Sequence, residues 1–151
     1  MTIEEAIKAT KKMELPTKTV INIMYTARYI EKQIDRFRER DISMQQYNVL
    51  RILRGQNGKP ANLSTLQERM IDKSSNTSRL VDKLIGKDLV QRRVCEANRR
   101  KVEIFITDDG LNLLKDLDPV TENANKDILK HLSQTELNTL NTLLDKLRKN
   151  E

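Results

Sequence analysis

The chain has 151 residues, a length that suits one domain with a sizeable core and is short for two. Charged residues make up 33% and aromatic residues 3%, so the core must be aliphatic, and the single cysteine excludes an intramolecular disulfide. No apolar run is long enough for a membrane span or a signal-peptide core, which predicts a cytoplasmic protein without a membrane partner.

The net charge of +6 is unevenly distributed along the chain. Residues 1–101 carry 22 Lys and Arg against 12 Asp and Glu, a balance of +10, whereas residues 102–151 carry 6 against 10, a balance of −4. A basic segment of this kind favours an anionic partner. Because no basic amphipathic helix with a bulky apolar edge is present, double-stranded DNA is a better expectation than a membrane surface.

The N-terminal arm, through Glu14, is loosely patterned and is expected to be either a short helix or a frayed segment. It leads into a long helix that is predicted over residues 16–40. Its apolar residues, from Val20 to Phe37, recur three and four positions apart and form a seam for packing against other helices. A break follows, and Ser43 with Gln46 then forms a capping box that predicts the start of the next helix.

The stretch from residue 62 onward has the pattern of two short helices joined by a turn at residues 71–73. Asn62 is a good N-cap for the first helix, and apolar residues follow it at helical spacing. The second helix is predicted to run from about Ser74 to Lys87, and it opens with five small polar residues.

This polar opening suits a helix that enters a DNA groove. The five residues are Ser74, Ser75, Asn76, Thr77 and Ser78. Side chains of this size reach base edges and phosphates with little steric bulk, whereas the alternative is that they only cap and start a helix. Arg79 and Lys83 lie four residues apart on the polar side of the helix. They favour DNA binding over a role in capping alone, because cations at these positions can contact phosphate or guanine.

After this helix the apolar period becomes alternating, which predicts a half-buried hairpin over residues 90–106. Asn98 suits its turn, and Arg99 and Arg100 lie at or near the tip, followed by Lys101. A run of cations is usually only a solvated surface. Here it directly follows a helix with a polar start, and this arrangement favours DNA binding. An arginine at the tip is suited to a narrow minor groove, where the negative potential is focused.

The order of two helices and a cationic hairpin resembles the winged helix-turn-helix core of the MarR family of bacterial transcription regulators. Two segments carry the resemblance: SNTSRLVDKLIGKDLVQRR, similar to the family's recognition helix and first wing strand, and NRRKVEIFITDDG, similar to its wing tip, second strand and next helix start. Two positions differ. Asn98 stands where the family usually has Asp, and Asp88 stands where it usually has the Gly that ends the recognition helix, so Asp88 would adopt a left-handed conformation at some cost.

The C-terminal third is predicted to be helical. Thr107 is a natural N-cap followed by two aspartates, and Pro119 is expected to interrupt or kink the helix that starts there. A second capping box, formed by Ser133 and Glu136, opens a last helix that is rich in leucine.

The expected fold class is mainly α with a small β wing (α+β), in a single domain over residues 1–151. The winged helix-turn-helix core spans about residues 43–107, and dimerisation helices span about 16–40 and 107–150. These apolar helices exceed what one small core covers, and the symmetry of DNA half-sites favours a homodimer. The alternative is a monomer that folds the helices back on itself.

The resemblance implies a sequence-specific DNA-binding transcription regulator, a ligand-responsive repressor that acts as a homodimer on a pseudo-palindromic operator. The DNA-binding candidates are Ser74, Ser75, Asn76, Thr77, Ser78, Arg79, Lys83, Asn98, Arg99, Arg100 and Lys101. A small phenolic or amphipathic effector would occupy the crevice between the dimerisation helices and the winged helix-turn-helix core. Its candidate lining, unless these residues are plain core, is Tyr25, Tyr29, Met44 and Tyr47. The alternative function is a winged-helix module for protein–protein interaction, which the cationic wing argues against.

Neither catalysis nor metal binding is expected, and no cofactor is implied. His131 and Cys95 are the sole residues of their types, so they supply neither a metal-ligand set nor a nucleophile with its base, and no glycine-rich phosphate loop is present. Cationic neighbours make a redox sensor the alternative reading of Cys95, and a small half-buried residue is the expected one.

Overall fold

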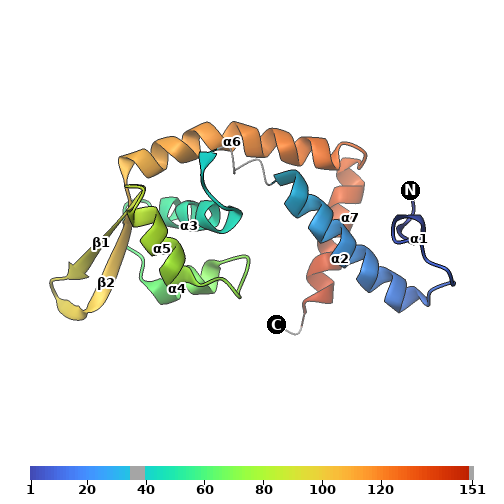
Figure 1. Ribbon diagram of the computed structural model, residues 1–151, viewed down its shortest axis with the longest axis horizontal. Coiled ribbons are helices and arrows are strands. Elements are labelled where there is room, and N and C mark those ends of the chain that lie inside the picture. Colours follow the sequence, from blue (N-terminus) through green and yellow to red (C-terminus); the bar gives the residue numbers. More distant parts are fainter. Residues whose placement is uncertain (35–39, 150–151) are drawn as a thin grey trace.

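The computed structural model describes residues 1–34 and 40–149 and is mainly helical, with one two-stranded antiparallel sheet, as predicted. The elements are α1 (Ile3–Ala6), α2 (Leu15–Ile34), α3 (Met44–Gly55), α4 (Leu63–Arg69), α5 (Thr77–Ile85), β1 (Val90–Cys95), β2 (Asn98–Ile106), α6 (Asp108–Leu129) and α7 (Gln134–Leu147). The block from α3 to β2 lies under one half of the long helix α6, and α1, α2 and α7 lie toward its other end (Figure 1). No helix in the described residues is long and apolar enough to cross a membrane.

Helices α2 and α3 begin close to where the sequence places them. α2 starts at Leu15 and is described to Ile34, while residues 35–39 of the predicted helix, with Phe37, lie outside the described residues. At the start of α3, the Gln46 N–H donates to Ser43 Oγ at 3.1 Å, and the Ser43 N–H donates to Gln46 Oε1 at 2.9 Å. The predicted capping box is therefore present.

The core is aliphatic and lies between α3, α4, α5, the hairpin and the first half of α6. Its fully buried side chains include Leu50, Leu66, Val81, Leu84, Ile104 and Leu114. Ala61, in the loop before α4, exchanges two backbone hydrogen bonds with Ile104, which ties this loop to β2. The hairpin therefore packs on the helices through its inner face while its far end projects away from them (Figure 1).

Pro119 does not interrupt α6, which runs unbroken from Asp108 to Leu129. Of the two predicted effects of Pro119, an interruption or a kink, the interruption is therefore wrong: a proline removes one helical hydrogen bond, and the helix continues on both sides of it. The preceding residue, Asp118, accepts two hydrogen bonds from the Arg54 guanidinium, at 2.7 and 3.2 Å, which fastens α6 to α3. The same hydrogen bonds raise the pKa of Arg54.

The last helix has the predicted start and an uncovered apolar face. The Ser133 and Glu136 capping box is present, and hydrogen bonds from Ser133 lower the pKa of Glu136. Leu143 and Leu147 on α7 are 57% and 67% exposed, and Met24 on α2 is 64% exposed. The single chain therefore leaves apolar side chains of both helices in solvent.

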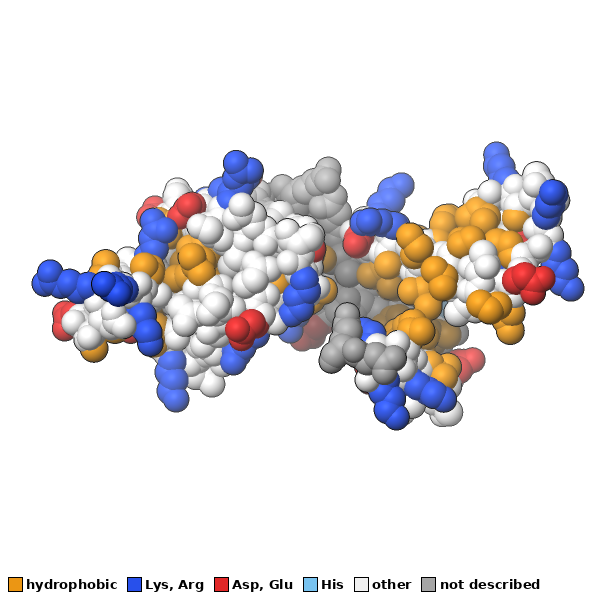
Figure 2. All heavy atoms as spheres, turned by 90° about the horizontal axis from the view of Figure 1, so that it is seen from below, with side chains coloured by type: hydrophobic (Ala, Val, Ile, Leu, Met, Phe, Trp, Pro, Cys, Tyr) orange, Lys and Arg blue, Asp and Glu red, His pale blue; other side chains and the backbone are white. Residues whose placement is uncertain are grey.

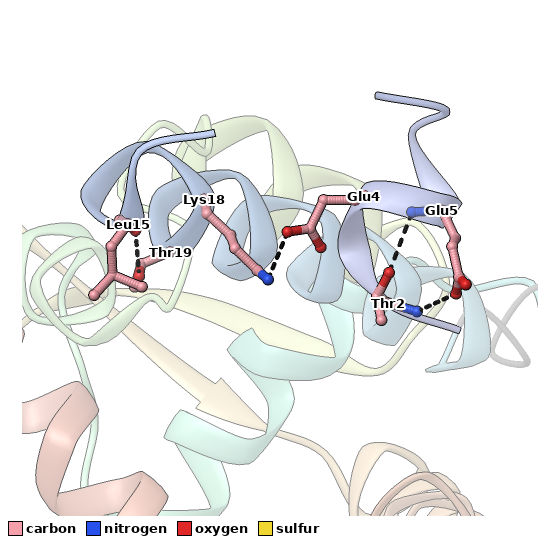
Figure 3. A network of polar contacts seen from close by, with 6 residues as sticks. All are labelled: Thr2, Glu4, Glu5, Leu15, Lys18 and Thr19. Carbon is pink, nitrogen blue, oxygen red and sulfur yellow. Dashed lines mark hydrogen bonds and ion pairs between the residues drawn. The ribbon is translucent and has the colours of Figure 1, made fainter. Parts of the chain in front are cut away.

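The N-terminal arm forms a short helix held against α2 (Figure 3). Thr2 and Glu5 form a capping box at the start of α1, and Ile3 is buried. Glu4 Oε1 lies 2.6 Å from Lys18 Nζ of α2, and this contact lowers the pKa of Glu4. Of the two predicted alternatives for this arm, the structure has the helix.

Candidate DNA-binding surface

The second helix of the helix-turn-helix unit, α5, begins at Thr77, three residues later than the predicted start at Ser74. Asn76 is the N-cap, and its side-chain oxygen accepts the N–H of Arg79 at 3.1 Å. The prediction failed because Asp72 competes for the preceding residues: its carboxylate accepts both the N–H and the hydroxyl of Ser74, at 3.0 and 2.6 Å. These hydrogen bonds lower the pKa of Asp72 and hold Ser74 in a turn.

The five polar residues of the predicted helix opening have different environments. Thr77 is buried and its hydroxyl donates to Gln67 Oε1, so the structure does not present it to a DNA base. Ser75 is half-buried, and its hydroxyl has no hydrogen-bond partner in the described part of the chain. Asn76 and Ser78 are exposed. Asn76 and Ser78 are therefore the two of the five residues whose side chains are exposed and are not bound to Asp72 as Ser74 is.

The cationic side of α5 faces solvent. Val81 and Leu84 point into the core with no exposed surface, while Arg79 and Lys83 are exposed. Neither cation takes part in an ion pair within residues 1–34 and 40–149. Their charges are therefore available to an anionic partner.

The wing is a hairpin with register Val90↔Ile106 through Val94↔Val102 and a two-residue turn after Cys95. Its three terminal cations, Arg99, Arg100 and Lys101, follow this turn at the start of β2. All three are exposed, and none forms an ion pair with another described residue. Asn98 is also exposed, and its side-chain oxygen accepts the N–H of Arg100 at 3.1 Å. It is the first residue of β2, directly after the turn, and not a left-handed turn residue.

The other two wing arginines are engaged within the protein, which the sequence did not reveal. Arg92 Nη1 lies 2.9 Å from Asp82 Oδ1 of α5, so an ion pair links the wing to the recognition helix. Arg93 stacks over the ring of Phe105, 5.1 Å from its centroid. Because side chains alternate along a strand, Arg92 lies on the same face as Val90, toward the helices, and Arg93 lies on the opposite face. This alternation was the one sequence signal that could have predicted different partners for the two arginines.

Asp88 adopts the left-handed conformation expected at the glycine-like position, with φ of 59°. Its N–H donates to Ile85 O at 3.0 Å, and its carbonyl accepts the Thr107 hydroxyl at 2.7 Å. The turn that ends the recognition helix is thereby joined to the start of α6.

The four predicted pocket residues do not line a common cavity. Tyr25 and Tyr29 border a cavity of about 170 Å³ between α1 and α2. Met44 borders a larger groove, of about 1330 Å³, between α2 and the winged helix-turn-helix core. Tyr47 is buried in the core, where the Arg51 guanidinium lies 5.8 Å from its ring centroid.

The larger groove is lined by charged side chains of both signs and reaches the helix-turn-helix unit. Its lining holds four cations, Arg28, Lys32, Lys83 and Lys87, and three carboxylates, Glu31, Asp41 and Asp72. It lies between α2, the turn before α5 and α5 itself. In the described residues, no cluster of three or more His, Cys, Asp or Glu is placed to hold a metal ion. Cys95 is half-buried and His131 is exposed.

Comparisons with known proteins agree on the family. A family model described as the MarR family matches residues 42–102. The HTH-type transcriptional regulator PecS of Dickeya dadantii is 32% identical over 124 residues, which cover 80% of this chain and 74% of PecS. The crystal structure of a MarR transcription factor from Planctomyces limnophilus is 30% identical, with a TM-score of 0.69, and the match covers 89% of this chain and 98% of that one. BpsR of Bordetella bronchiseptica, described as regulated in its DNA binding by 6-hydroxynicotinic acid, has a TM-score of 0.80 at 19% identity, over 93% of this chain and 100% of BpsR.

Proposed function

The chain belongs to the MarR family of DNA-binding transcription regulators, and we propose that it acts as a homodimeric, ligand-responsive repressor on a pseudo-palindromic operator. The DNA-binding proposal rests on one observation: α5 and the wing each present exposed cations without an ion-pair partner among the described residues, and an ion pair holds these two elements together. Arg79 and Lys83 lie on α5, and Arg99 lies near the tip of the wing, while the Asp82–Arg92 ion pair links these two elements.

In the proposed complex, α5 lies in a major groove and the wing reaches the flanking minor groove. Asn76, Ser78 and Arg79 are the candidates for base readout, because their side chains are exposed at the start of α5. Arg99 and Arg100 supply contacts to phosphates and the minor groove. A two-fold dimer would set half-site centres roughly 10 base pairs apart.

The dimer proposal rests on the uncovered apolar faces. Figure 2 shows hydrophobic side chains gathered over the half of the molecule that holds α1, α2 and α7, while Lys and Arg project from both halves. An isologous contact between two copies would bury this apolar surface. Sedimentation equilibrium tests it: Leu143→Glu should shift the protein toward monomer, and Asn138→Glu, which adds the same charge to another side of α7, should not.

The effector proposal rests on the unpaired cations of the larger groove. Arg28 is paired with Glu31 at 2.7 Å and Lys87 with Asp41 at 3.1 Å, but Lys32 and Lys83 form no ion pair with another described residue. The groove therefore suits a small aromatic compound with an acidic group, such as an aromatic carboxylate or a phenolate. The regulation described for BpsR supports this class. A screen of such acids for release of the protein from DNA, repeated with Lys32→Gln, tests it.

The first experiment is fluorescence anisotropy of the protein with the duplex upstream of its own gene and with a scrambled duplex, each over a salt series. A specific regulator binds the native duplex more tightly and both duplexes with a steep salt dependence. Weak, equal and salt-insensitive binding would refute the DNA-binding surface and favour a protein–protein module instead.

A further inference from the structure

One side chain joins the three parts of the helix-turn-helix unit. Gln67 lies on α4, its Nε2 donates to the carbonyl of Lys73 in the turn at 2.9 Å, and its Oε1 accepts the hydroxyl of Thr77. Both polar atoms of this amide are thus used inside the protein. Thr77 is 4% exposed and is the first residue of α5.

These contacts act at the end of α5 that the proposed function assigns to base readout. α5 has nine residues, and so short a helix is held mainly by its tertiary contacts. Its fully buried core anchors, Val81 and Leu84, are the fifth and eighth of these residues. In the first turn, Leu80 packs partly against the core and Thr77 is buried. Since Thr77 is the first residue of the helix, its hydrogen bond to Gln67 fixes the end that carries Ser78 and Arg79.

We propose that Gln67 is a positioning residue for DNA readout: its amide fixes the start of the recognition helix, so that discrimination between duplexes depends on it although it contacts no base. This inference rests on the proposed DNA-binding function. A first turn that is ordered before binding loses little conformational entropy on the operator. Phosphate contacts from Lys83 and the wing do not require that order, so non-specific affinity is independent of Gln67.

The test is a double-mutant cycle of Gln67→Met and Thr77→Val, two substitutions that keep the side-chain volume and remove the hydrogen-bonding groups. Anisotropy against the native and scrambled duplexes gives the ratio of the two affinities. Each single variant should lower this ratio by roughly 5- to 30-fold with the salt slope unchanged. The double variant should lose no more than Gln67→Met alone, because the contact that Thr77→Val breaks is one of the two that Gln67→Met breaks.

Two controls separate this role from others. Thr77→Ser keeps the hydroxyl and should retain most of the wild-type ratio. Glu68→Ala removes an exposed neighbour on α4 and should behave as wild type. All variants are compared below the onset of their thermal unfolding, so that loss of folded protein does not enter the ratio.

Each outcome is decisive. If Gln67→Met lowers the ratio and Thr77→Val does not, the effect of Gln67 does not pass through Thr77, and the proposed positioning role is overturned. Unchanged ratios in both single variants also overturn it, as do equal losses on both duplexes with a shallower salt slope. If the wild-type protein itself shows no preference for the native duplex, the proposed function has failed, which is a separate result from any of these.

Discussion

Gly110 stands where the recognition-helix turn, the wing and α6 meet, and replacing it with alanine should destabilise the protein. A Cβ at this position would lie 2.4 Å from the carbonyl oxygen of Leu89 and 2.7 Å from Cγ1 of Ile106. The Leu89 carbonyl already accepts the N–H of Thr107 at 3.1 Å. It is therefore a backbone group fixed by a hydrogen bond, and it cannot turn away as a flexible side chain would. Relief of the clash therefore requires α6 to move away from the base of the wing.

Overpacking of this kind costs about 1 to 3 kcal/mol. For a domain of this size each kcal/mol lowers Tm by about 2 to 4 °C, so Gly110→Ala should lower Tm by about 2 to 12 °C. Circular dichroism at a fixed protein concentration measures this shift, because Tm of an oligomer depends on concentration. Specific DNA affinity should fall as well, since the wing is attached at this point.

Gly55→Ala is the matched control. A Cβ at Gly55 meets nothing within 4 Å, and the residue is the last of α3, so alanine should leave stability unchanged or raise it by up to about 1 kcal/mol. If Gly110→Ala unfolds at the same temperature as Gly55→Ala, the close approach of Gly110 to Leu89 does not constrain the fold, and the reasoning is refuted.

Three further predictions concern charge. Arg99→Ala should weaken binding to native and scrambled duplexes alike and reduce the salt slope by about 1; an unchanged slope in a salt titration would exclude a phosphate contact. Arg54→Ala and Asp118→Ala should not be additive in urea unfolding, with a coupling of about 1 kcal/mol, because both remove the same ion pair between α3 and α6. Hydrogen bonds from Ser74 lower the pKa of Asp72, so its stabilisation of the turn is complete above the usual Asp value near 4 and is lost as pH falls through the lower folded pKa. In a carbon-13 NMR titration, Ser74→Ala, which removes the hydroxyl and keeps the backbone N–H, should raise the pKa of Asp72 toward its usual value, and a pKa that does not move would exclude the hydroxyl hydrogen bond as a cause.

Helix starts were predictable where the capping interaction is local. Ser43, Thr107 and Ser133 all cap the helices expected of them, because a capping hydrogen bond joins residues three apart and needs no other part of the chain. The left-handed conformation of Asp88 was expected on another ground, the family resemblance, which places a glycine at this position.

The start of the recognition helix was not predictable in this way. Ser74 and Ser75 are acceptable in a first helical turn, and Asp72 is equally able to hold them outside it. Two local solutions compete here, and the observed one is accompanied by hydrogen bonds of Lys73 and Thr77 to Gln67, which lies on another helix.

Composition, periodicity and local capping thus determined the fold class, the order of the elements and the cationic character of the wing, because each depends on residues close together in the chain. Only the tertiary structure decided which polar groups remain free. Thr77 is buried, Arg92 is paired with Asp82, and Tyr47 lies in the core away from the groove. The physical reason is that burial and pairing of a side chain depend on partners from distant segments, whose approach no local pattern records.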